Sequence, residues 1–212
     1  MATKLSVYQG ACALLGTRKL ASLTEAQLSR RELDGIFARG GITTCLQMGQ
    51  WNFAMRTIQL DYSPSVEPDF GLRRAFDKPT DWVRTCGMCS DEYFREPLLD
   101  YVDERGYWYS DLDTLYVRYV SNDTQYGMDY SLWPQNFARV VECYFAKETC
   151  LRLTQSQSLK DSLEGTFAKL LLKAKSTDAM DEATTFASEG SWVRARRGGR
   201  SGERGNRGRL IG

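Results

Sequence analysis

Apolar and polar positions follow a helical period at both ends of the 212-residue chain and a strand period in its middle. In the first segment, residues 4–15, apolar side chains recur every three or four positions. Thr3 stands where a helix cap is expected, and Gly16 stands where a helix ends. This pattern predicts an amphipathic helix over residues 4–15.

A second helical pattern extends to Gly49. It begins at residues 24–27, Thr-Glu-Ala-Gln, which have the spacing of a capping box. The pattern then crosses Gly40 and Gly41, and each glycine costs a helix on the order of 1 kcal/mol relative to Ala. Either the helix breaks there or another backbone packs closely against it. We expect a continuous helix with a bend.

The stretch Cys45–Ala54 connects this helical pattern to the first strand pattern. Trp51 and Phe53 each offer a large apolar surface for burial. Gly49 suits the left-handed backbone that ends many helices, and Asn52 can hydrogen-bond within its own turn. These four residues predict a rigid structural corner between a helix and a strand.

Residues 55–128 have a sequence pattern that predicts a small antiparallel sheet. The segments with alternating or β-branched and aromatic positions are Arg56–Tyr62, Leu72–Phe76, Tyr101–Gly106, Tyr107–Ser110 and Thr114–Val120. Between the second and third of them, Asp81–Cys86 predicts a short helical turn.

Helical periodicity returns at Trp133, where the following Pro134 suits the first position of a helix. One pattern continues to Thr154 and another covers residues 159–174, whereas residues 177–187 show a weaker one. After Gly190 the chain is rich in Arg and Gly and has no core-forming pattern, so we expect it to be disordered in the free protein.

These elements predict an α+β fold, in which the N- and C-terminal segments form one helical bundle and an antiparallel β-rich domain is inserted between them. The expected parts are residues 1–54 (helical), 55–128 (β-rich insertion), 129–187 (helical) and 188–212 (extended Arg/Gly-rich tail).

Charge is distributed unevenly, although the net charge is only +1. Residues 194–212 contain seven Arg and one Glu, which gives 7 − 1 = +6, so the rest of the chain carries 1 − 6 = −5. No apolar run reaches the roughly 18 residues that a membrane helix needs. The N-terminus also lacks the apolar region of a secretory signal. We therefore expect a soluble protein that is made in a cytoplasm.

Candidate catalytic and metal-binding residues are few. The chain has no His, which excludes the Ser-His-Asp and Cys-His arrangements. No phosphate-binding glycine loop is recognisable. Cys86 and Cys89 form the only close cysteine pair, and the chain offers no matching second pair to complete a structural zinc site.

Acidic residues gather between the predicted strands, namely Asp100, Asp103, Glu104, Asp111 and Asp113. Two carboxylates could serve glycoside hydrolysis, and several could hold calcium. Acids that simply solvate turns explain the same pattern, and we favour that explanation. The sequence therefore predicts neither an enzyme nor a cofactor.

The Arg/Gly-rich tail has two functional interpretations. Arg among Gly suits flexible binding to nucleic-acid phosphates. It also suits a segment that becomes ordered in a protein groove, where Arg binds carboxylates and the backbone adds to a strand edge. Apolar anchors at both ends, and the lack of aromatics among the Arg residues, favour the second interpretation; a merely solvated tail is the third possibility. The candidate contact residues are Trp192, Val193, Arg194, Arg196, Arg197, Arg200, Leu210 and Ile211.

Several stretches resemble the tail tubular protein A, or head-to-tail adaptor, family of tailed bacteriophages, in its podophage type. Residues 5–23 are similar to the opening helix of that family, and Gly49–Ala54 to its helix-end signature. Gly190–Arg196 resembles its C-terminal entry, and Pro79–Trp82 fits its loop between strands.

The resemblance implies a non-enzymatic virion protein at the head–tail interface. Members form a dodecameric ring that joins the portal protein to the tail nozzle protein and leaves a channel for double-stranded DNA, without specific DNA binding. The helical part and the C-terminal segment would meet the portal, and the β-rich part would meet the nozzle or tail fibres. An acidic body suits such a channel because like charge discourages DNA from sticking.

The aromatic residues of the β-rich part exceed what one small sheet can bury, which is typical of contact surfaces. Tyr107, Trp108 and Tyr109, together with Tyr116 and Tyr119, are therefore candidates for contact with the nozzle, the fibres or a neighbouring subunit. Two alternatives remain. One is a nucleic-acid-binding protein with an Arg/Gly-rich arm, and the other is a cell-wall hydrolase that uses the acids of residues 100–113.

Overall fold

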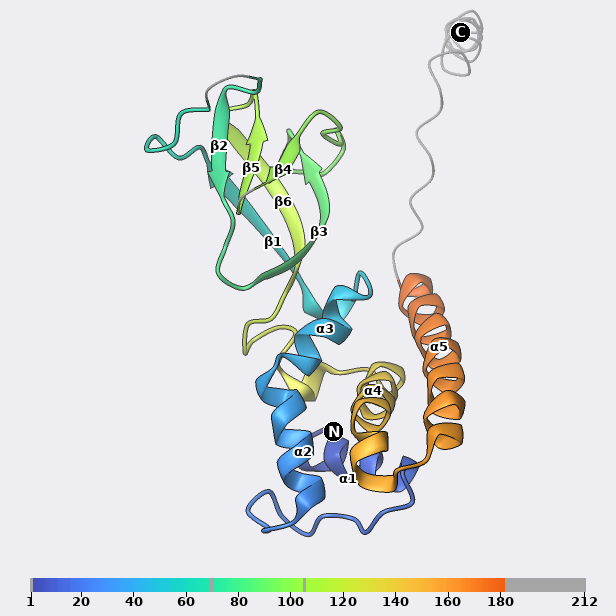
Figure 1. Cartoon of the computed structure of the whole chain (residues 1–212). Helices are drawn as coiled ribbons and strands as arrows, with labels where there is room; N and C mark the ends of the chain where they lie inside the picture. The colour runs from blue at the N-terminus through green and yellow to red at the C-terminus, as the bar shows by residue number, and fades with distance from the viewer. Residues whose placement is uncertain (1, 69–70, 105, 182–212) are drawn as a thin grey trace, which may run out of the picture. The chain divides into compact units, whose positions relative to one another are not determined.

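The computed structural model describes residues 2–68, 71–104 and 106–181. The chain up to Asp181 forms one compact unit, in which helices come first, strands follow and helices return. Figure 1 shows the helices and the two small sheets of this unit. The predicted α+β fold, with a β-rich insertion between helical segments, is confirmed. The predicted tail, residues 188–212, lies outside the described residues.

Helix α1, Lys4–Leu14, forms where the first apolar pattern predicted it. Its N-terminus is a capping box, because the Thr3 hydroxyl accepts the Ser6 N–H at 3.1 Å and the Ser6 hydroxyl accepts the Thr3 N–H at 2.8 Å. Gly16, just after the helix, has a left-handed φ of +67°. The cap and the stop of this helix were both predicted correctly.

The second helical pattern forms two helices, α2 (Leu28–Ala38) and α3 (Gly41–Gln47). The prediction of one continuous helix is wrong, because Gly40 has a left-handed φ of +79° and separates the two. Gly41 permits a close approach, since a Cβ there would lie 2.7 Å from Ile36 Cγ2. Gly40 is therefore needed for its left-handed backbone, and Gly41 is needed because a side chain there would collide with Ile36.

The capping box expected at residues 24–27 does not open α2. Gln27 occupies the N-cap position and makes no capping hydrogen bond with its side chain. The Thr24 hydroxyl instead lies 3.0 Å from that of Ser22, and the Glu25 carboxylate accepts the Ala21 N–H at 2.8 Å. Thr24, which the capping pattern placed at the start of the helix, therefore makes its side-chain contact within the preceding loop.

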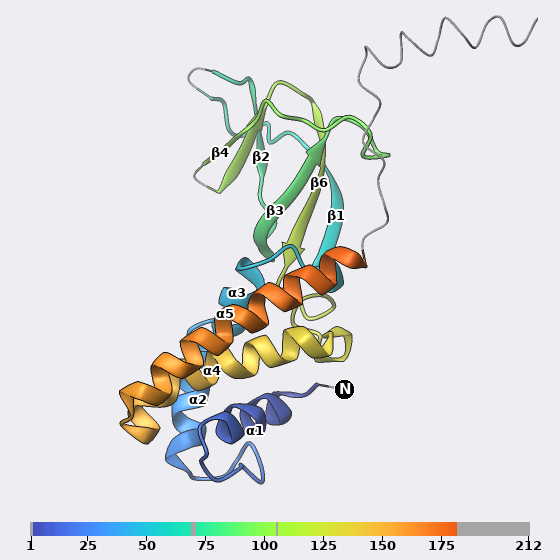
Figure 2. The same cartoon turned by 90° about the vertical axis from the view of Figure 1, so that its right-hand side faces the viewer.

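Two long helices end the described chain, α4 (Gln135–Thr154) and α5 (Gln157–Met180). Pro134 lies at the N-cap position of α4, and the Ser156 hydroxyl caps α5 by accepting the Leu159 N–H at 3.3 Å. Helix α4 lies between α1 and α5 (Figure 2). Within the described residues, no helix is both long and apolar enough to cross a membrane.

The middle of the chain forms strands that pair antiparallel in two three-stranded sheets, with the orders β1-β6-β3 and β2-β5-β4. The strands are β1 (Met55–Asp61), β2 (Arg74–Asp77), β3 (Trp82–Cys89), β4 (Val102–Glu104), β5 (Tyr107–Ser110) and β6 (Thr114–Ser121). A short 3-10 helix, Asn52–Ala54, precedes β1, and another, Tyr130–Leu132, follows β6.

Two predictions for this region are wrong. Two sheets form in place of the single sheet expected. Residues 81–86, expected as a helical turn, belong largely to β3, which pairs with β6. The register of that pairing shifts twice within β3, and such bulges break the regular alternation of buried and exposed positions. The sequence of β3 therefore lacks the period of two that identifies a strand.

Two hydrophobic clusters hold these elements together. The larger cluster lies among the helices and also contains Val83 of β3 and Val120 of β6, so one end of the β1-β6-β3 sheet belongs to the helical core. The smaller cluster draws on both sheets and consists of Phe76, Met88, Trp108, Leu115, Val117 and Tyr119. Helices and sheets are thus joined by a shared core at the place where the chain passes between them.

Candidate functional site at the junction of helices and sheets

Trp51 is the centre of the junction between α3 and β1. Its side chain is 1% exposed, and its indole N–H donates to the Cys45 carbonyl oxygen at 3.2 Å. Its ring meets that of Phe137 edge-on, with 4.9 Å between centroids, and Phe53 packs on the same Phe137 ring at 4.8 Å. The aromatic side chains of the corner therefore anchor it to α4.

Gly49 makes room for the Trp51 ring. The described glycines with a left-handed backbone are Gly16, Gly40, Gly71 and Gly106, so the predicted left-handed helix end at Gly49 is wrong. A Cβ at Gly49 would lie only 2.6 Å from Trp51 Cε2. The residue is needed because a side chain there would collide with a buried ring.

Asn52 connects the junction to the end of α5. Its backbone N–H donates to the two carboxylate oxygens of Asp178 at 3.1 and 3.3 Å, and its side-chain amide donates to the Asp178 carbonyl oxygen at 2.7 Å. The expected hydrogen bond within its own turn is replaced by this contact, 126 residues away in sequence. Asp178 was not predicted as a site residue, because no local sequence pattern indicates a partner so distant.

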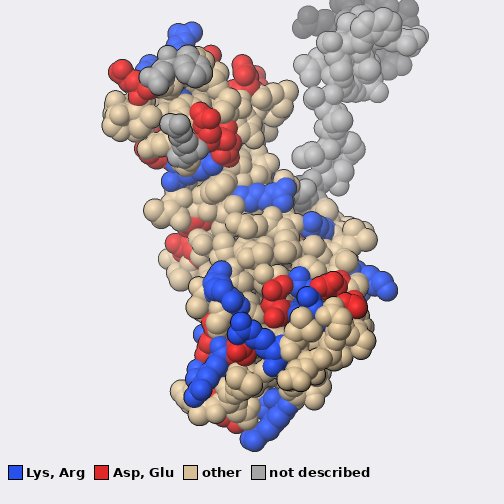
Figure 3. Space-filling view, viewed as in Figure 1, with Lys and Arg blue, Asp and Glu red and all other residues tan. Residues whose placement is uncertain are grey.

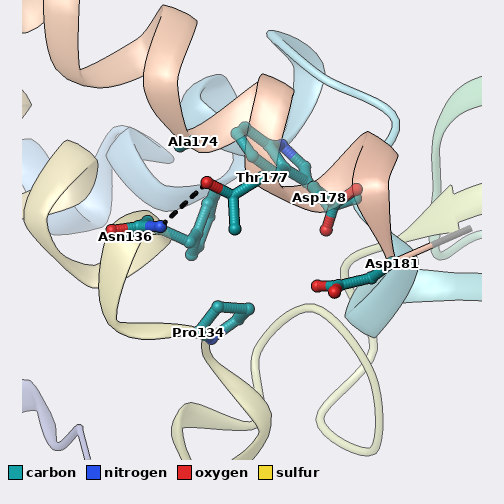
Figure 4. Close-up of a pocket in the computed structure, with 8 residues that line it drawn as sticks. Pro134, Asn136, Ala174, Thr177, Asp178 and Asp181 are labelled. Atoms are coloured by element: carbon teal, nitrogen blue, oxygen red, sulfur yellow. Dashed lines mark hydrogen bonds between the residues drawn. The ribbon is translucent and has the colours of Figure 1, made fainter.

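A shallow pocket opens beside this contact, between the start of α4 and the end of α5 (Figure 4). The apolar side chains that line it belong to Trp51, Pro134, Phe137 and Ala174, and the polar ones to Asn136, Thr177, Asp178 and Asp181. The Asn136 side-chain amide donates to the Thr177 hydroxyl at 3.2 Å across one side of it. Most of its polar groups thus serve to join α5 to the rest of the bundle.

On the sheet side of the junction, Asp81 forms hydrogen bonds with side chains from the ends of β1 and β6. Its carboxylate accepts the Tyr119 hydroxyl at 3.0 Å and an Arg56 guanidinium N–H at 2.9 Å, and the Ser121 hydroxyl donates to it as well. Burial alone would raise the pKa of Asp81, but these hydrogen bonds outweigh it and hold the pKa below its ordinary value. Burial of the ring, and then the hydrogen bond to Asp81, raise the pKa of Tyr119.

The aromatic residues predicted to be contact surfaces divide into two groups. Trp108 and Tyr119 are fully buried between the sheets, so their prediction as contact residues is wrong. Tyr107 and Tyr109 are half-buried, with 6.2 Å between their ring centroids. The error follows from the missed second sheet, since two facing sheets bury more aromatic surface than one.

Three acids of residues 100–113 form ion pairs with cations close to or within β2. Asp103 pairs with Lys78, and Asp113 lies 2.9 Å from Arg74. Lys78 is almost buried, and its ammonium lies 3.9 Å from the centroid of the Trp82 ring. This pairing favours the interpretation of these acids as stabilising surface charges and gives no support to a hydrolase.

Cysteines are scattered through the described residues. Cys12, Cys45, Cys89, Cys143 and Cys150 are buried, and Cys86 is half-buried. Residues 2–68, 71–104 and 106–181 contain no group of three or more cysteines or acids that could hold a metal ion. Burial raises the pKa of the Cys143 thiol to about 11, which keeps it protonated at neutral pH.

The tail residues predicted to contact the portal lie outside the described residues. They are Trp192, Val193, Arg194, Arg196, Arg197, Arg200, Leu210 and Ile211.

No protein-family model matches the chain, and no curated protein matches its sequence.

Proposed function

We propose that this chain is a structural virion protein, the head-to-tail adaptor that joins a portal protein to a tail nozzle protein. Copies of the chain form a ring, dodecameric by analogy with the family that the sequence resembles. Double-stranded DNA passes through the central channel without specific binding, and tail fibres are a further candidate partner. The protein is made in the host cytoplasm and acts at the head–tail interface of the virion.

The observation that carries this proposal is the junction. An adaptor must hold two partners in a fixed position relative to each other. It therefore needs two binding parts that are joined without a flexible hinge. Trp51 fills the core between the parts, and Asn52 holds the end of α5 by three hydrogen bonds. Arg84 of β3 also donates to the Gln47 carbonyl oxygen of α3 at 3.1 Å. The junction therefore favours a two-ended structural protein.

Exposed apolar side chains on both parts give further support. Leu28 on α2 is 62% exposed and Leu172 on α5 is 72% exposed, whereas Leu99 in the β part is 88% exposed. Single exposed hydrophobic residues are common on monomers, and they stabilise an assembly only where a partner covers them. Surfaces of this kind on both parts fit a protein with partners at two ends.

The β part and the helical parts also differ in net charge, and this difference suits a DNA channel. Residues 55–128 contain 8 basic and 14 acidic residues, a net charge of 8 − 14 = −6. Residues 1–54 and 129–187 together contain 13 basic and 11 acidic residues, a net charge of +2. The acidity of the body thus belongs to the β part, which we place along the DNA path because it repels phosphates.

Sedimentation of the purified protein, with and without a purified portal protein, tests the proposal. We expect a ring-sized assembly in at least one of the two conditions, and assembly should need no nucleic acid. A protein that stays monomeric in both conditions contradicts the adaptor role.

The tail separates the adaptor from the nucleic-acid-binding alternative. Deleting residues 190–212 should leave the folded body intact and abolish stable attachment to portal-bearing capsids. Two matched tail variants divide the possibilities: Trp192→Ser removes an apolar anchor without changing charge, and Arg196→Gln with Arg197→Gln removes charge. Portal attachment should be lost with Trp192→Ser. If only the Arg variant has an effect, and that effect is on DNA binding, the alternative is correct.

A further inference from the structure

Residues 90–104, here called the tip segment, comprise the loop after β3 and the strand β4. Hydrogen bonds within the loop and to β3 order this segment. The Asp91 carboxylate accepts the backbone N–H groups of Arg95 at 3.0 Å and Glu96 at 2.9 Å, and the Leu98 N–H donates to the Met88 carbonyl oxygen at 2.8 Å. A loop that is already ordered loses less entropy on binding than a flexible one.

The tip segment exposes large apolar side chains close together in the chain. Tyr93 is 69% exposed, Leu99 is 88% exposed and Val102 is 46% exposed. Single exposed hydrophobic residues are normal on a protein surface, but three within ten residues of an ordered segment are typical of a contact surface. Nothing in the packing of the described residues requires Leu99 to be apolar, because it is almost fully in solvent.

The same segment is strongly acidic. It contains six acids and one base, Arg95, which gives a net charge of 1 − 6 = −5. Lys78 neutralises Asp103, whereas Glu92, Asp100 and Glu104 are exposed and form no ion pair with any described residue. Figure 3 shows acidic side chains on the β part and a band of basic side chains over the α2 region. A partner for this surface should therefore be basic.

Strand β4 adds a backbone edge to these side chains. It is an outer strand of the order β2-β5-β4 and, among the described residues, pairs only with β5. All of its residues are exposed. Backbone groups on the outer side of such a strand can hydrogen-bond an added strand. Val102 and Glu104 point to one face of the sheet because side chains alternate along a strand. An added strand would thus find an apolar and an acidic side chain next to each other.

We propose that the tip segment binds an extended, basic segment of another protein, which pairs with the outer edge of β4. Its apolar side chains would cover Leu99 and Val102, and its Lys or Arg side chains would pair with Asp100 and Glu104. A second copy of the tip segment is a poor occupant, since two segments of charge −5 repel each other. The inference goes beyond the adaptor role and does not depend on ring formation.

A short synthetic peptide, Lys-Lys-Val-Val-Lys-Lys, tests the proposal with the full-length protein. In an extended peptide of this sequence each face carries one Val flanked by Lys, as the β4 edge requires. We expect peptide-dependent changes in amide chemical shifts that are confined to residues 90–104 and the adjoining β5. The peptide Glu-Glu-Val-Val-Glu-Glu is the charge-reversed control and should not bind.

Variants of unchanged charge separate specific docking from general attraction to an acidic protein. Leu99→Ser and Val102→Ser should each lower the affinity for the basic peptide at least tenfold. Leu28→Ser, which removes an exposed Leu from α2, should leave that affinity unchanged. Unchanged melting temperatures establish that the variants fold. Equal affinity in Leu99→Ser, equal binding of the charge-reversed peptide, or shifts located on the helices would each overturn the proposal. Self-association of the protein that Leu99→Ser abolishes would also overturn it, because the occupant would then be a second copy.

Discussion

The backbone N–H of Asn52 lies 3.1 Å from a carboxylate oxygen of Asp178, and the Asn52 side-chain amide lies 2.7 Å from the Asp178 carbonyl oxygen. Asn52 begins the 3-10 helix that leads into β1, and Asp178 belongs to the last turn of α5. One pair of residues therefore fixes the exit of the chain from the helices relative to the end of the last described helix.

Asn52→Asp tests the strength of this contact. The substitution keeps the shape of the side chain, removes its donor and places a second carboxylate beside Asp178. We expect the free energy of unfolding to fall by about 1–3 kcal/mol, the usual cost of leaving a partly buried hydrogen-bonding group without its partner. Urea unfolding measures the change. Asn136→Asp is the matched control, because Asn136 also donates to α5 but through a solvent-exposed bond to Thr177, and it should change stability by less than about 0.5 kcal/mol.

Trp51→Ala should be a folding lesion. Removing a buried aromatic side chain costs roughly 3–5 kcal/mol, which is a large part of a domain's stability. Thermal melting measures it. An unchanged melting temperature combined with lost assembly would mean that Trp51 acts at an interface, in contradiction to its 1% exposure.

Gly49→Ala should destabilise the protein only while the Trp51 ring is present. The new methyl group would lie 2.6 Å from that ring, and overpacking of this kind costs about 1–3 kcal/mol. In the Trp51→Ala background the same substitution should cost far less, so a double-mutant cycle gives a large coupling energy. Gly165→Ala in α5 is the control: a Cβ there meets nothing within 4 Å, and it should stabilise the helix by up to about 1 kcal/mol. Equal costs for Gly49→Ala in both backgrounds would refute the steric explanation.

Local sequence patterns predicted the features of this fold that depend on neighbouring residues. The capping box at Thr3, the start of α4 after Pro134 and the regular strand β6 each have their signal within a few positions. The burial of Trp51 also followed from its apolar surface beside a helical pattern. In each case the deciding interaction is short in sequence or is the hydrophobic effect alone.

Features set by distant partners could not be predicted in this way. The apolar pattern continues without interruption across Gly40, although the helix breaks there. Packing with the rest of the protein decides between a bend and a break. Trp108 was predicted to be exposed because the second sheet, which covers it, was not predicted. The strand β3 was not predicted because two register shifts break its alternation. The partner of Asn52 lies 126 residues away. At the candidate site, therefore, the sequence indicated the residues of the corner but not what holds them.

Asp81→Asn should reduce stability in a pH-dependent way. In the folded protein the pKa of Asp81 lies below its ordinary value of 3.8, since hydrogen bonds from Ser121, Arg56 and Tyr119 outweigh burial. The charged carboxylate therefore stabilises the fold fully above pH 3.8, and this contribution is lost as the pH falls through the depressed pKa. We expect Asp81→Asn to cost roughly 1.5–3 kcal/mol at pH 7, the range for hydrogen bonds to a charged group.

Urea unfolding of wild type and Asp81→Asn between pH 2.5 and pH 7 measures this difference, which should shrink toward the acid end. Asp61→Asn on the exposed end of β1 is the control, because its carboxylate accepts a solvent-exposed hydrogen bond from Thr114. It should change stability by less than about 0.5 kcal/mol. A difference for Asp81→Asn that stays constant across the pH range would contradict a role for the charge.

Glu142 gives the opposite pH dependence. Its carboxyl group on α4 presses against α1, where a Cβ on Gly10 would lie 2.3 Å from Glu142 Cδ. Burial raises the pKa of Glu142 above its ordinary value of 4.5, and the nearby Arg139 lowers it by less. The folded state thus binds this proton more tightly than the unfolded state does. Its contribution to stability is favourable below pH 4.5 and is lost as the pH rises through the raised pKa.

Glu142→Gln keeps the size of the side chain and removes the charge that opposes burial. The free energy of unfolding should therefore be higher than that of the wild type at pH 7, and the two proteins should converge near pH 3.5, where Glu142 is protonated. Glu148→Gln on the same helix is the control, because Glu148 is exposed and lies 3.2 Å from Lys147, and it should bring no gain at pH 7. A Glu142→Gln protein that is less stable than the wild type at pH 7 would show that the carboxylate is held by a favourable contact. Glu142 would then belong among the groups that stabilise the α1–α4 pair, as Asp81 does for the strand ends.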